Sequence, residues 1–476
     1  MENIRKLIVR EFGREAEELI PLKQSGSDRK YVRFRIGNQT GMAAENPNVR
    51  ENIAFFQMSR HFRDKGINLP EVYAVSEDKT TYLLQDLGDT SLFQHLSDKR
   101  EGETIHPETL AYYRQALDQL SEMQTRAADG FNYDHTWPVR EFDKQAVLWD
   151  LNYFKYYYAR LSQAPFDEHA LEKDFHALAD FLLKAPSDFF MFRDFQSRNI
   201  MIHDKKVWFI DYQGGRKGAL QYDVASLLWQ ARAQLPIAVR NKLLSSYLKS
   251  LEQRIPVKQG DFMMYYEAYV LIRVLQTLGA YGFRGLYEQK SHFILSIPLA
   301  MDNLRYIRQN FSCLDEYPEL RSLTGKLLDD AYQLWPGSTA TSGKLRVQIM
   351  SFSYKKGLPR DFSGHGGGHV FDCRALHNPG RYDEFKKLTG KDQAVLDFLD
   401  KTEGMQDFMK NVIQIVTQSV DTYRRRKFDF LSVAFGCTGG QHRSVYAAEK
   451  MADFLKNNYS VDIVIHHREQ KHLNHE

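Results

Sequence analysis

The chain has 476 residues, of which 43% are hydrophobic and 26% charged, a balance typical of globular proteins with sizeable cores. The formal net charge of +3 gives no overall field that would favour nucleic acid or an anionic membrane as a partner. Three widely spaced cysteines, a charged N-terminal segment and no apolar run of bilayer length lead us to expect a cytoplasmic protein without a membrane partner.

The first 90 residues combine helix and strand patterns. Apolar residues on one helical face predict an amphipathic helix over residues 2–20. A small-residue turn at 24–28 leads into a strand ending at Ile36, and Gly and Ser in such a turn let main-chain N–H groups approach phosphates closely. A hairpin turn without a ligand would look the same. A helix beginning at Glu51 and a strand running into a connector over 82–88 follow.

The residues that suggest chemistry follow a helical region at 107–184. Phosphoryl transfer from ATP needs a carboxylate to orient or deprotonate the attacking hydroxyl, and an amide oxygen with a second carboxylate to hold Mg²⁺. Protein-kinase-like folds take these from an Asp, an Asn five residues later, and an Asp after a short hairpin. Asp194, Asn199 and Asp211 have this spacing around a predicted hairpin at 200–210. Taken singly, each is also a common turn former or helix cap.

The composition changes at 335–343, a run rich in Pro, Gly, Ser and Thr that predicts a linker. Strands predicted at 345–352, 369–372, 430–435 and 461–465 alternate with helices after it. This alternation favours a compact α/β domain with a largely parallel sheet.

The strand that ends at Phe435 runs into the loop Gly-Cys-Thr-Gly-Gly-Gln-His-Arg-Ser at 436–444, and a helix follows from Val445. Free N–H groups at a helix N-terminus and the planar fork of Arg443 suit a phosphate group. The spacing from Cys437 to Arg443 is also that of phosphatase loops in which a thiolate attacks phosphate. The spacing alone therefore permits either binding or hydrolysis.

Residues 1 to about 330 resemble the aminoglycoside phosphotransferase-like kinases, most closely the AmgK-type anomeric kinases of N-acetylmuramate and N-acetylglucosamine. The matching motifs are Gly-Ser-Asp-Arg-Lys-Tyr at 26–31, Leu-Gln-Asp-Leu-Gly at 84–88, Phe-Arg-Asp-Phe-Gln-Ser-Arg-Asn at 192–199, Ile-Asp-Tyr-Gln at 210–213 and Tyr-Asp-Val-Ala-Ser-Leu-Leu at 222–228. The resemblance implies an α+β two-lobed kinase fold. It also implies ATP, Mg²⁺ and an amino-sugar acceptor phosphorylated at the anomeric hydroxyl.

The resemblance gives roles to individual residues. Asp194 is the expected catalytic base, and Asn199 and Asp211 are the expected metal ligands. The expected ATP-binding residues lie in the glycine-containing turn and in the connector: Ser25, Gly26, Ser27, Arg29, Gln85 and Leu87.

The sequence departs from the kinase pattern at two places. Phe192 stands where these kinases carry a His of mostly architectural role. Many kinases grip the phosphates with the lysine of an Ala-x-Lys motif, but Met-Ala-Ala-Glu-Asn at 42–46 has none. The candidate replacements are Arg29, Lys30 and Arg33.

Residues 345–472 resemble the C-terminal domain of the RapZ regulators of amino-sugar synthesis. The match covers Ser-Phe-Ser-Tyr-Lys-Lys-Gly-Leu-Pro at 351–359, Val-Phe-Asp-Cys-Arg at 370–374, Asn-Pro-Gly at 378–380, Leu-Thr-Gly at 388–390, the 436–444 loop and His-His-Arg at 466–468. It implies binding of a phosphorylated amino sugar, with Lys356 in place of a family His. The expected ligand-binding residues are Lys356, Arg374, Thr438, Gly439, Gly440, Gln441, His442, Arg443 and Ser444.

We therefore predict a sugar kinase domain at 1–332, a linker at 333–344 and a smaller, mostly parallel α/β domain at 345–476. The leading hypothesis is an ATP-dependent amino-sugar kinase joined to an amino-sugar-phosphate sensor. A second is a regulator whose kinase half only binds nucleotide, which the missing lysine favours and the intact Asp and Asn set disfavours. RNA binding is a third, disfavoured by the low charge and by a weakly basic tail at 470–476. Self-association through the last domain stays open.

Overall fold

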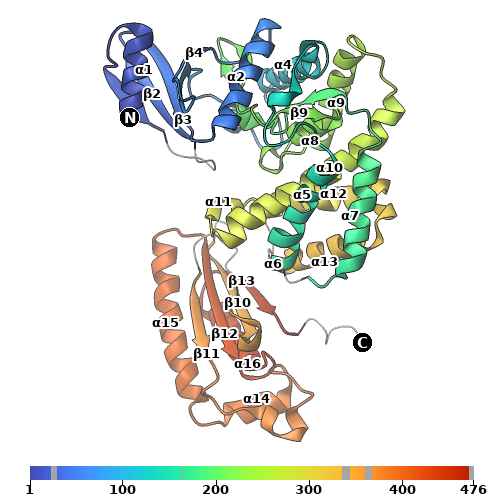
Figure 1. Ribbon diagram of the computed structural model, residues 1–476. Coiled ribbons are helices and arrows are strands. Elements are labelled where there is room, and N and C mark those ends of the chain that lie inside the picture. The colour runs from blue at the N-terminus through green and yellow to red at the C-terminus, as the bar shows by residue number, and fades with distance from the viewer. Residues whose placement is uncertain (23–28, 163, 335–343, 360–366, 471–476) are drawn as a thin grey trace. The chain divides into compact units, whose positions relative to one another are not determined.

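The structure is a computed structural model that describes residues 1–22, 29–162, 164–334, 344–359 and 367–470. The chain forms two compact units, Met1–Ala280 with Leu299–Gly325, and Tyr281–Pro298 with Lys326–Glu476 (Figure 1). The predicted linker residues 335–343 lie outside the described ranges. Across the described ranges, no helix is long and apolar enough to cross a lipid bilayer.

The first unit begins with a five-stranded antiparallel sheet in the order β1-β2-β3-β5-β4. Its strands are β1 (Glu18–Pro21), β2 (Lys30–Ile36), β3 (Gln39–Glu45), β4 (Val72–Val75) and β5 (Thr81–Gln85). Helix α1 (Glu2–Phe12) packs on the sheet through Ile4, Leu7 and Ile8. Helix α2 (Val49–Asp64) connects β3 to β4 and carries a glutamate, Glu51, in its first turn.

The predicted helix over 2–20 is wrong beyond Phe12. Gly13 ends the helix in the left-handed conformation, with φ of 71°, and its N–H donates to the carbonyl of Val9. Glu18–Pro21 form the edge strand β1 instead, where Leu19 pairs with Phe34 of β2. The apolar residues near 20 had continued the helical period, but their ladder hydrogen bonds to β2 decide their conformation.

The rest of the first unit is mainly helical. The longer helices that lie wholly or mainly in it are α3 (Leu92–Asp98), α4 (Pro107–Gln124), α5 (Lys144–Phe154), α7 (Glu168–Leu182), α8 (Gln221–Leu228), α9 (Ile237–Glu252), α10 (Gln259–Tyr281) and α12 (Ile297–Asn310). Helix α13 (Pro318–Leu334) begins in the first unit and continues into the second. Two small antiparallel ladders carry the loops of interest: β6 (Phe189–Met191) with β9 (Arg216–Gly218), and β7 (Ile200–His203) with β8 (Lys206–Phe209). A sheet-containing part followed by a helical part confirms the predicted α+β two-lobed kinase-like fold.

The second unit contains the predicted parallel sheet, in the order β11-β12-β10-β13. Every pairing in it is parallel, and its strands are β10 (Arg346–Ser353), β11 (His369–Asp372), β12 (Phe430–Cys437) and β13 (Asp462–His467). Helices α14 (Gln393–Asp400), α15 (Met405–Arg425) and α16 (Arg443–Asn458) share one core with the strands. The predicted α/β architecture is confirmed.

Gly41 gives a test of how the first sheet is packed. It lies in β3 opposite Phe34 of β2, whose ring is buried against it, so that a β-carbon on Gly41 would lie 2.1 Å from Phe34 Cζ. Gly41→Ala must displace this ring, and we expect a loss of about 1–3 kcal/mol in the free energy of unfolding. Urea unfolding measures it, with the exposed neighbour Thr40→Ala as the control. Equal stability of Gly41→Ala and wild type would contradict this packing.

Candidate functional site

The loop that leads to Asp194 is held by a buried carboxylate. The main-chain N–H groups of Phe192 and Arg193 donate to the two carboxylate oxygens of Asp223 at 2.7 and 2.9 Å. Asp223 lies in α8, where Gln124 also donates to it at 3.1 Å. Burial raises the pKa of the Asp223 carboxyl to about 7, and the hydrogen bonds from the loop act in the opposite direction. The backbone just before Asp194 is therefore fixed to a helix of the core.

Arg193 adds a second anchor. Its φ of 81° is left-handed, a conformation that a non-glycine residue keeps only when its surroundings hold it. Its guanidinium forms a two-pronged ion pair with Asp150 of α5, at 2.8 and 2.6 Å, and donates to the hydroxyl of Tyr222. Because both terminal nitrogens of Arg193 are paired with Asp150, the side chain of Arg193 is held in one orientation beside Asp194.

Asn199 closes the loop behind Asp194. Its Nδ2 donates to the main-chain carbonyl of Asp194 at 2.9 Å, and the N–H of Gln196 donates to the same oxygen at 2.8 Å. Asn199 in turn accepts the N–H of Ile210 through its own carbonyl at 3.0 Å. The predicted hairpin between them is confirmed, and it returns the chain to this point.

The turn at Asp204 and Lys205 is short enough to bring the end of β8 back beside the start of β7. Asp204 and Lys205 have φ of 49° and 59°, the pair of positive values that a two-residue turn matched to the strand twist requires. Ile200 consequently pairs with Phe209, which places residue 211 at the same end of the hairpin as Asn199.

The carboxyl group of Asp211 is in a position that disfavours its charged form. Burial raises the pKa of its carboxyl and the nearby charge of Asp194 adds to the rise, while a hydrogen bond from Gln213 at 2.9 Å and the charges of Arg29 and Arg198 lower it. The rise means that a cation placed beside Asp211 would relieve an unfavourable charge.

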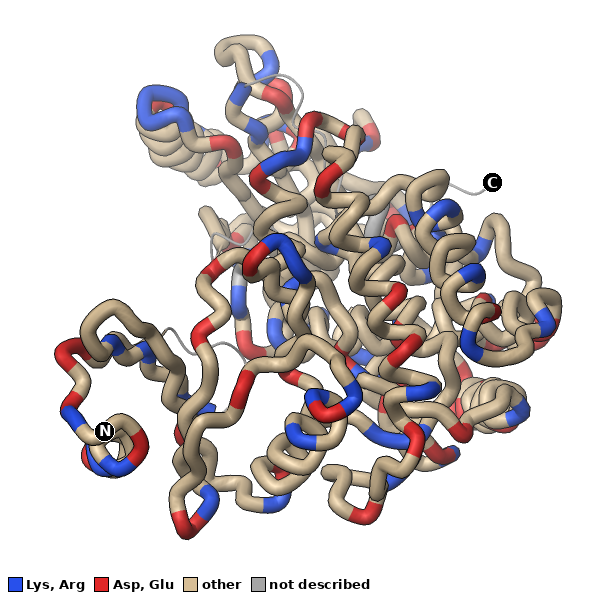
Figure 2. Tube along the Cα trace, turned by 90° about the horizontal axis from the view of Figure 1, so that it is seen from above, with Lys and Arg blue, Asp and Glu red and all other residues tan. Residues whose placement is uncertain are grey.

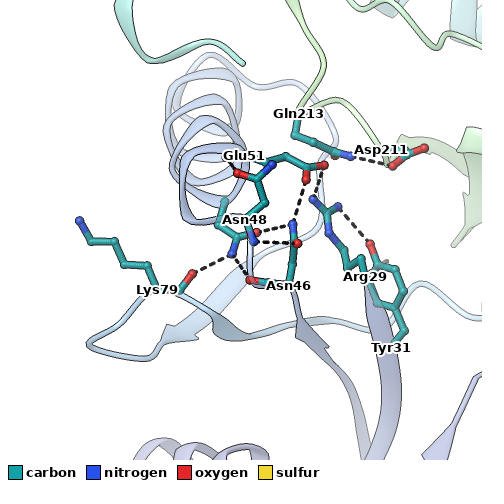
Figure 3. A network of polar contacts seen from close by, with 9 residues as sticks. Arg29, Tyr31, Asn46, Asn48, Glu51, Lys79, Asp211 and Gln213 are labelled. Carbon is teal, nitrogen blue, oxygen red and sulfur yellow. Dashed lines mark hydrogen bonds and ion pairs between the residues drawn. The ribbon is translucent and has the colours of Figure 1, made fainter. Parts of the chain in front are cut away.

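An ion pair between Arg29 and Glu51, on the side of the sheet, lies close to Asp211 (Figure 3). Arg29, just before β2, contacts Glu51 of α2 with Nη2 and Oε1 2.9 Å apart, and is itself 5% exposed. Asn46 donates to the other oxygen of Glu51 at 2.9 Å and is held in turn by Asn52 at 3.0 Å. Glu51 therefore has both carboxylate oxygens fixed, one by a cation that comes from the second strand rather than the third.

The other two candidates for the missing lysine lie elsewhere. Arg33 forms ion pairs with Asp86 and Asp89 of the connector, both at 2.8 Å. Lys30 is exposed to solvent. Of the three residues, Arg29 is the one that pairs with the carboxylate of α2.

The remaining residues predicted to bind ATP are only partly described. Ser25, Gly26 and Ser27 lie outside the residues that the structure describes. Gln85 ends β5 and exchanges hydrogen bonds with the main chain of Glu71, while Leu87 is buried in the connector that follows.

These elements surround one pocket of about 320 Å³. It is lined by Glu51, Trp137, Pro138, Arg193, Asp194, Asp211, Gln213, Gly214 and Arg216. The predicted base and one predicted metal ligand therefore share a cavity with the carboxylate of α2. Arg216, which the sequence analysis did not single out, belongs to it as well.

The oxygen atoms at this pocket fit Mg²⁺. Gln213 binds Oδ1 of Asp211, and Asn199 uses its Nδ2 group, so that Asp211 Oδ2 and Asn199 Oδ1 remain as oxygen donors within the described part of the chain. Mg²⁺ in phosphotransfer sites is typically held by one or two carboxylates together with phosphate oxygens. No group of three or more His, Cys, Asp or Glu side chains that could hold a metal occurs among the described residues.

The second predicted site is the loop between β12 and α16. Several of its polar groups bind the protein itself. Gln441 donates to the carbonyls of Lys386 and Leu388 at 3.1 and 2.7 Å, and a ring nitrogen of His442 lies 2.9 Å from the carbonyl oxygen of Phe385. These contacts fasten the loop to the segment before α14.

The thiol of Cys437 is enclosed by the loop. It is 3% exposed, accepts the N–H of Gly440 at 3.1 Å and lies 3.1 Å from the hydroxyl oxygen of Ser444. Gly440 has φ of 70°, which favours glycine, and a β-carbon there would lie 2.3 Å from Glu469. Gly439, by contrast, faces open space among the described residues.

A pocket of about 700 Å³ lies beside the loop. Its lining is Arg374, Ala375, Leu376, His377, Asn378, Arg381, Phe398, Thr402, Glu403, Thr438 and Arg443. The structure thus brings together Arg374, Thr438 and Arg443 of the predicted set. Arg443 is buried, and its Nη1 donates to the carbonyls of Arg374 and Leu376 at 2.8 Å each.

Lys356 lies apart from this lining. Its ammonium pairs with Glu469 at 2.6 Å, and its side chain is exposed. Arg374 forms an ion pair with Asp372 at 2.7 Å and lies over the ring of Tyr354 at 3.9 Å.

The residues missed by sequence reasoning are mostly buried charges. Asp223 had a usable signal, an acidic residue inside the otherwise apolar helix segment 222–228, because a buried carboxylate needs partners. The sequence carried no comparable signal for Asp150 and Glu51, since a single acidic residue on a helix is usually solvated. Arg216 follows two glycines, and its sequence neighbourhood gives no sign that it is buried.

Comparison with known proteins gives two separate matches. Residues 33–256 match the family model of the phosphotransferase enzyme family, and residues 345–471 match that of the RapZ C-terminal domain. The chain is 40% identical over 129 residues to a nucleotide-binding protein of Acidothermus cellulolyticus, and 39% identical over 125 residues to one of Bacillus licheniformis. Each alignment covers 26% of this chain. The chain spans about two fifths of the length of these curated relatives, 40% and 41%.

Two solved structures align with about two thirds of the chain. A choline/ethanolamine kinase family protein from Mesorhizobium loti aligns with a TM-score of 0.45 and 15% identity, covering 67% of this chain and 98% of that one. A thermostable mutant of the aminoglycoside phosphotransferase APH(4)-Ia, in ternary complex with ADP and hygromycin B, aligns with a TM-score of 0.44 and 15% identity, covering 65% and 99%. From its two family matches, the chain carries a phosphotransferase-family domain followed by a RapZ C-terminal domain.

Proposed function

We propose that the first unit is a cytoplasmic kinase that transfers the γ-phosphoryl group of ATP to a hydroxyl of an amino sugar, with the anomeric hydroxyl of an N-acetylmuramate or N-acetylglucosamine type acceptor as the expected position. The observation that carries the proposal is the shared pocket of Glu51, Asp194 and Asp211, with Asn199 fixed to the loop of Asp194. The three free cysteines fit a reducing compartment. The choice of sugar rests on the motifs at 26–31 and 192–228.

The mechanism follows from the side chains at the pocket. Mg²⁺, held by Asn199 and Asp211, would neutralise charge on the phosphates. Asp194 accepts the proton of the acceptor hydroxyl while the acceptor oxygen bonds to the γ-phosphorus, the bond to the β-phosphate oxygen breaks and ADP leaves. Asp194 can do this because Arg193 and Asn199 hold its backbone rigidly, so that its carboxylate needs little reorganisation.

In this proposal, Arg29 binds the phosphates of ATP in place of the lysine that many kinases use. Kinases pair that lysine with a glutamate of the helix after the third strand. Here the corresponding carboxylate, Glu51, pairs with Arg29, whose fork suits phosphate oxygens. This pair weighs against the alternative of a nucleotide-binding regulator without activity, which the absence of lysine at 42–46 had favoured.

For the second unit, we propose binding of a phosphorylated amino sugar at the pocket of Arg374, Thr438 and Arg443. Arg381, His377 and Asn378 add polar groups to the same lining. Hydrolysis at this site is disfavoured, because the thiol of Cys437 is buried under the loop and is not part of the lining.

RNA binding and self-association of the second unit remain the alternatives. An RNA surface needs clustered basic residues. Over the described trace as a whole, Lys and Arg lie among Asp and Glu (Figure 2), although the second unit carries one basic run, 424–427, at the end of α15. The low formal net charge of +3 favours a small anionic ligand over a polynucleotide.

The kinase proposal is tested by incubating the protein with ATP, Mg²⁺ and a panel of amino sugars and identifying the product by phosphorus NMR, which gives substrate and position together. We expect Asp194→Asn to lower turnover by about 100- to 10,000-fold, the usual contribution of a general base, with ATP binding retained.

The matched control is Asp204→Asn, the same substitution at an exposed turn of the adjoining hairpin. We expect wild-type turnover for it. A turnover for Asp194→Asn above a tenth of wild type would remove this residue from the role of base. No transfer to any amino sugar by the wild type would reject the substrate class.

Arg29 and Glu51 should act as a unit on the nucleotide. Because Arg29 would grip phosphate only while Glu51 orients it, Arg29→Met and Glu51→Gln should each lower kcat/KM for ATP by roughly 10- to 100-fold, as expected for hydrogen bonds to a charged group. The double variant should lose little more than either single one. Lys30→Met, a neighbouring exposed cation, is the control, and an equal loss there would contradict the assignment.

The second unit gives a separate test by calorimetry on the full chain with glucosamine-6-phosphate. Arg443→Ala should weaken binding by about 1.5–3 kcal/mol, because it removes a charged donor and loosens the 374–376 segment. Cys437→Ser should bind as wild type does. Phosphate release by the wild type that Cys437→Ser abolishes would instead identify a phosphatase.

A further inference from the structure

Arg216 is a buried cation at the kinase pocket. It begins β9, where it pairs with Met191 of β6, three residues before Asp194. It is 5% exposed and lines the pocket together with Asp194. Its Nε donates to the carbonyl of Gly214 at 3.0 Å, which leaves the two terminal amino groups of the guanidinium for other partners.

No carboxylate of the described chain forms an ion pair with Arg216, although its neighbours at the same pocket are neutralised. Arg193 is paired with Asp150, and Arg29 with Glu51. Burying an unpaired cation is costly unless an anion compensates it. Burial and, after it, the charge of Arg193 lower the pKa of Arg216 to about 10, so the guanidinium stays protonated at neutral pH. A protonated, buried guanidinium that reaches a pocket is suited to an anion supplied from outside.

Arg216 belongs to the ladder that leads into the loop of Asp194, because β9 pairs with β6 and the chain runs from β6 into that loop. The residues proposed to hold the nucleotide phosphates, Arg29 and Glu51, come instead from the sheet side and from α2. Asp194 accepts the proton of the acceptor hydroxyl in the proposed reaction, so the acceptor lies beside Asp194 in the pocket that Arg216 also lines.

We propose that Arg216 binds an anionic substituent of the acceptor, a carboxylate or a phosphate, and so sets a preference for charged over neutral sugars. The inference rests on the proposed kinase activity and specifies its substrate class. Trp137, half-buried and lining the same pocket, supplies an apolar wall for the sugar ring beside this charge.

The test compares three acceptors that differ in charge: N-acetylmuramate, which carries a carboxylate, N-acetylglucosamine 6-phosphate, which carries a phosphate, and neutral N-acetylglucosamine. For each, kcat/KM is measured with ATP, and the dissociation constant is measured by calorimetry in the presence of ADP and Mg²⁺. We expect the wild type to favour one charged acceptor over the neutral one by roughly 10- to 100-fold. The charged acceptor with the higher kcat/KM identifies whether Arg216 binds a carboxylate or a phosphate.

Arg216→Gln should reduce that ratio to near one, and Arg216→Lys should keep part of it because the charge remains without the fork. Because the ratio is taken within one variant, a general loss of folded protein cancels. Lys217→Gln is the matched control. It removes the same charge one residue away, where Lys217 pairs with Asp188 at 2.8 Å, and should leave the ratio unchanged.

Three results would overturn the proposal: no preference for a charged acceptor in the wild type, an unchanged ratio in Arg216→Gln, or equal losses for all acceptors, which would assign Arg216 to the transferred phosphoryl group. If the wild type uses and binds none of the sugars, the amino-sugar proposal itself fails. Arg216 is then judged by titrating lactate and inorganic phosphate into the complex with ADP and Mg²⁺. Binding weakened by Arg216→Gln but not by Lys217→Gln supports the anion site, and any other result rejects it.

Discussion

The buried carboxylate of Asp223 is the constraint on which the kinase pocket depends. It accepts hydrogen bonds from the main-chain N–H groups of Phe192 and Arg193, at 2.7 and 2.9 Å, and so connects the loop before Asp194 to the core helix α8. The left-handed backbone of Arg193 persists because this anchor and the ion pair with Asp150 hold it from both ends. The backbone of Asp194 is thus positioned by its neighbours, and its side chain lines the pocket in which we propose that it acts as the base.

In the proposed kinase, the ion pair between Arg29 and Glu51 would stand in for the lysine of the third strand. The first residue before β2 supplies the cation, and its guanidinium reaches the helix carboxylate at 2.9 Å. Asn46, at the end of β3, holds the second oxygen of that carboxylate. Under this proposal, the residue before β2 supplies the positive charge, and the residue after β3 supplies an amide that holds the same carboxylate.

Local patterns were predictable from the sequence, and long-range pairings were not. The hairpin at 200–209 follows from its turn and from strand alternation, and the parallel sheet of the second unit from regular alternation of elements. The helix beginning at Glu2 was extended too far because Leu19 continued its period, whereas the end was decided by Gly13 and by pairing with β2. Contacts such as that of Arg193 with Asp150 join residues 43 positions apart and leave no periodic trace.

At the two proposed anion sites, some polar groups hold the loop and others line the pocket. In the second unit, the side chains of Gln441 and His442 are used on main-chain carbonyls, and Cys437 caps the loop from beneath. The spacing of the 436–444 motif could not separate these tasks, because a residue that fastens a loop and one that binds phosphate can be of the same type. Arg443 holds two carbonyls with one amino group and also lines the pocket, so the proposed ligand would meet a residue that fastens the loop. The thiol of Cys437 is 3% exposed and does not line the pocket, which makes recognition a better explanation of this loop than hydrolysis.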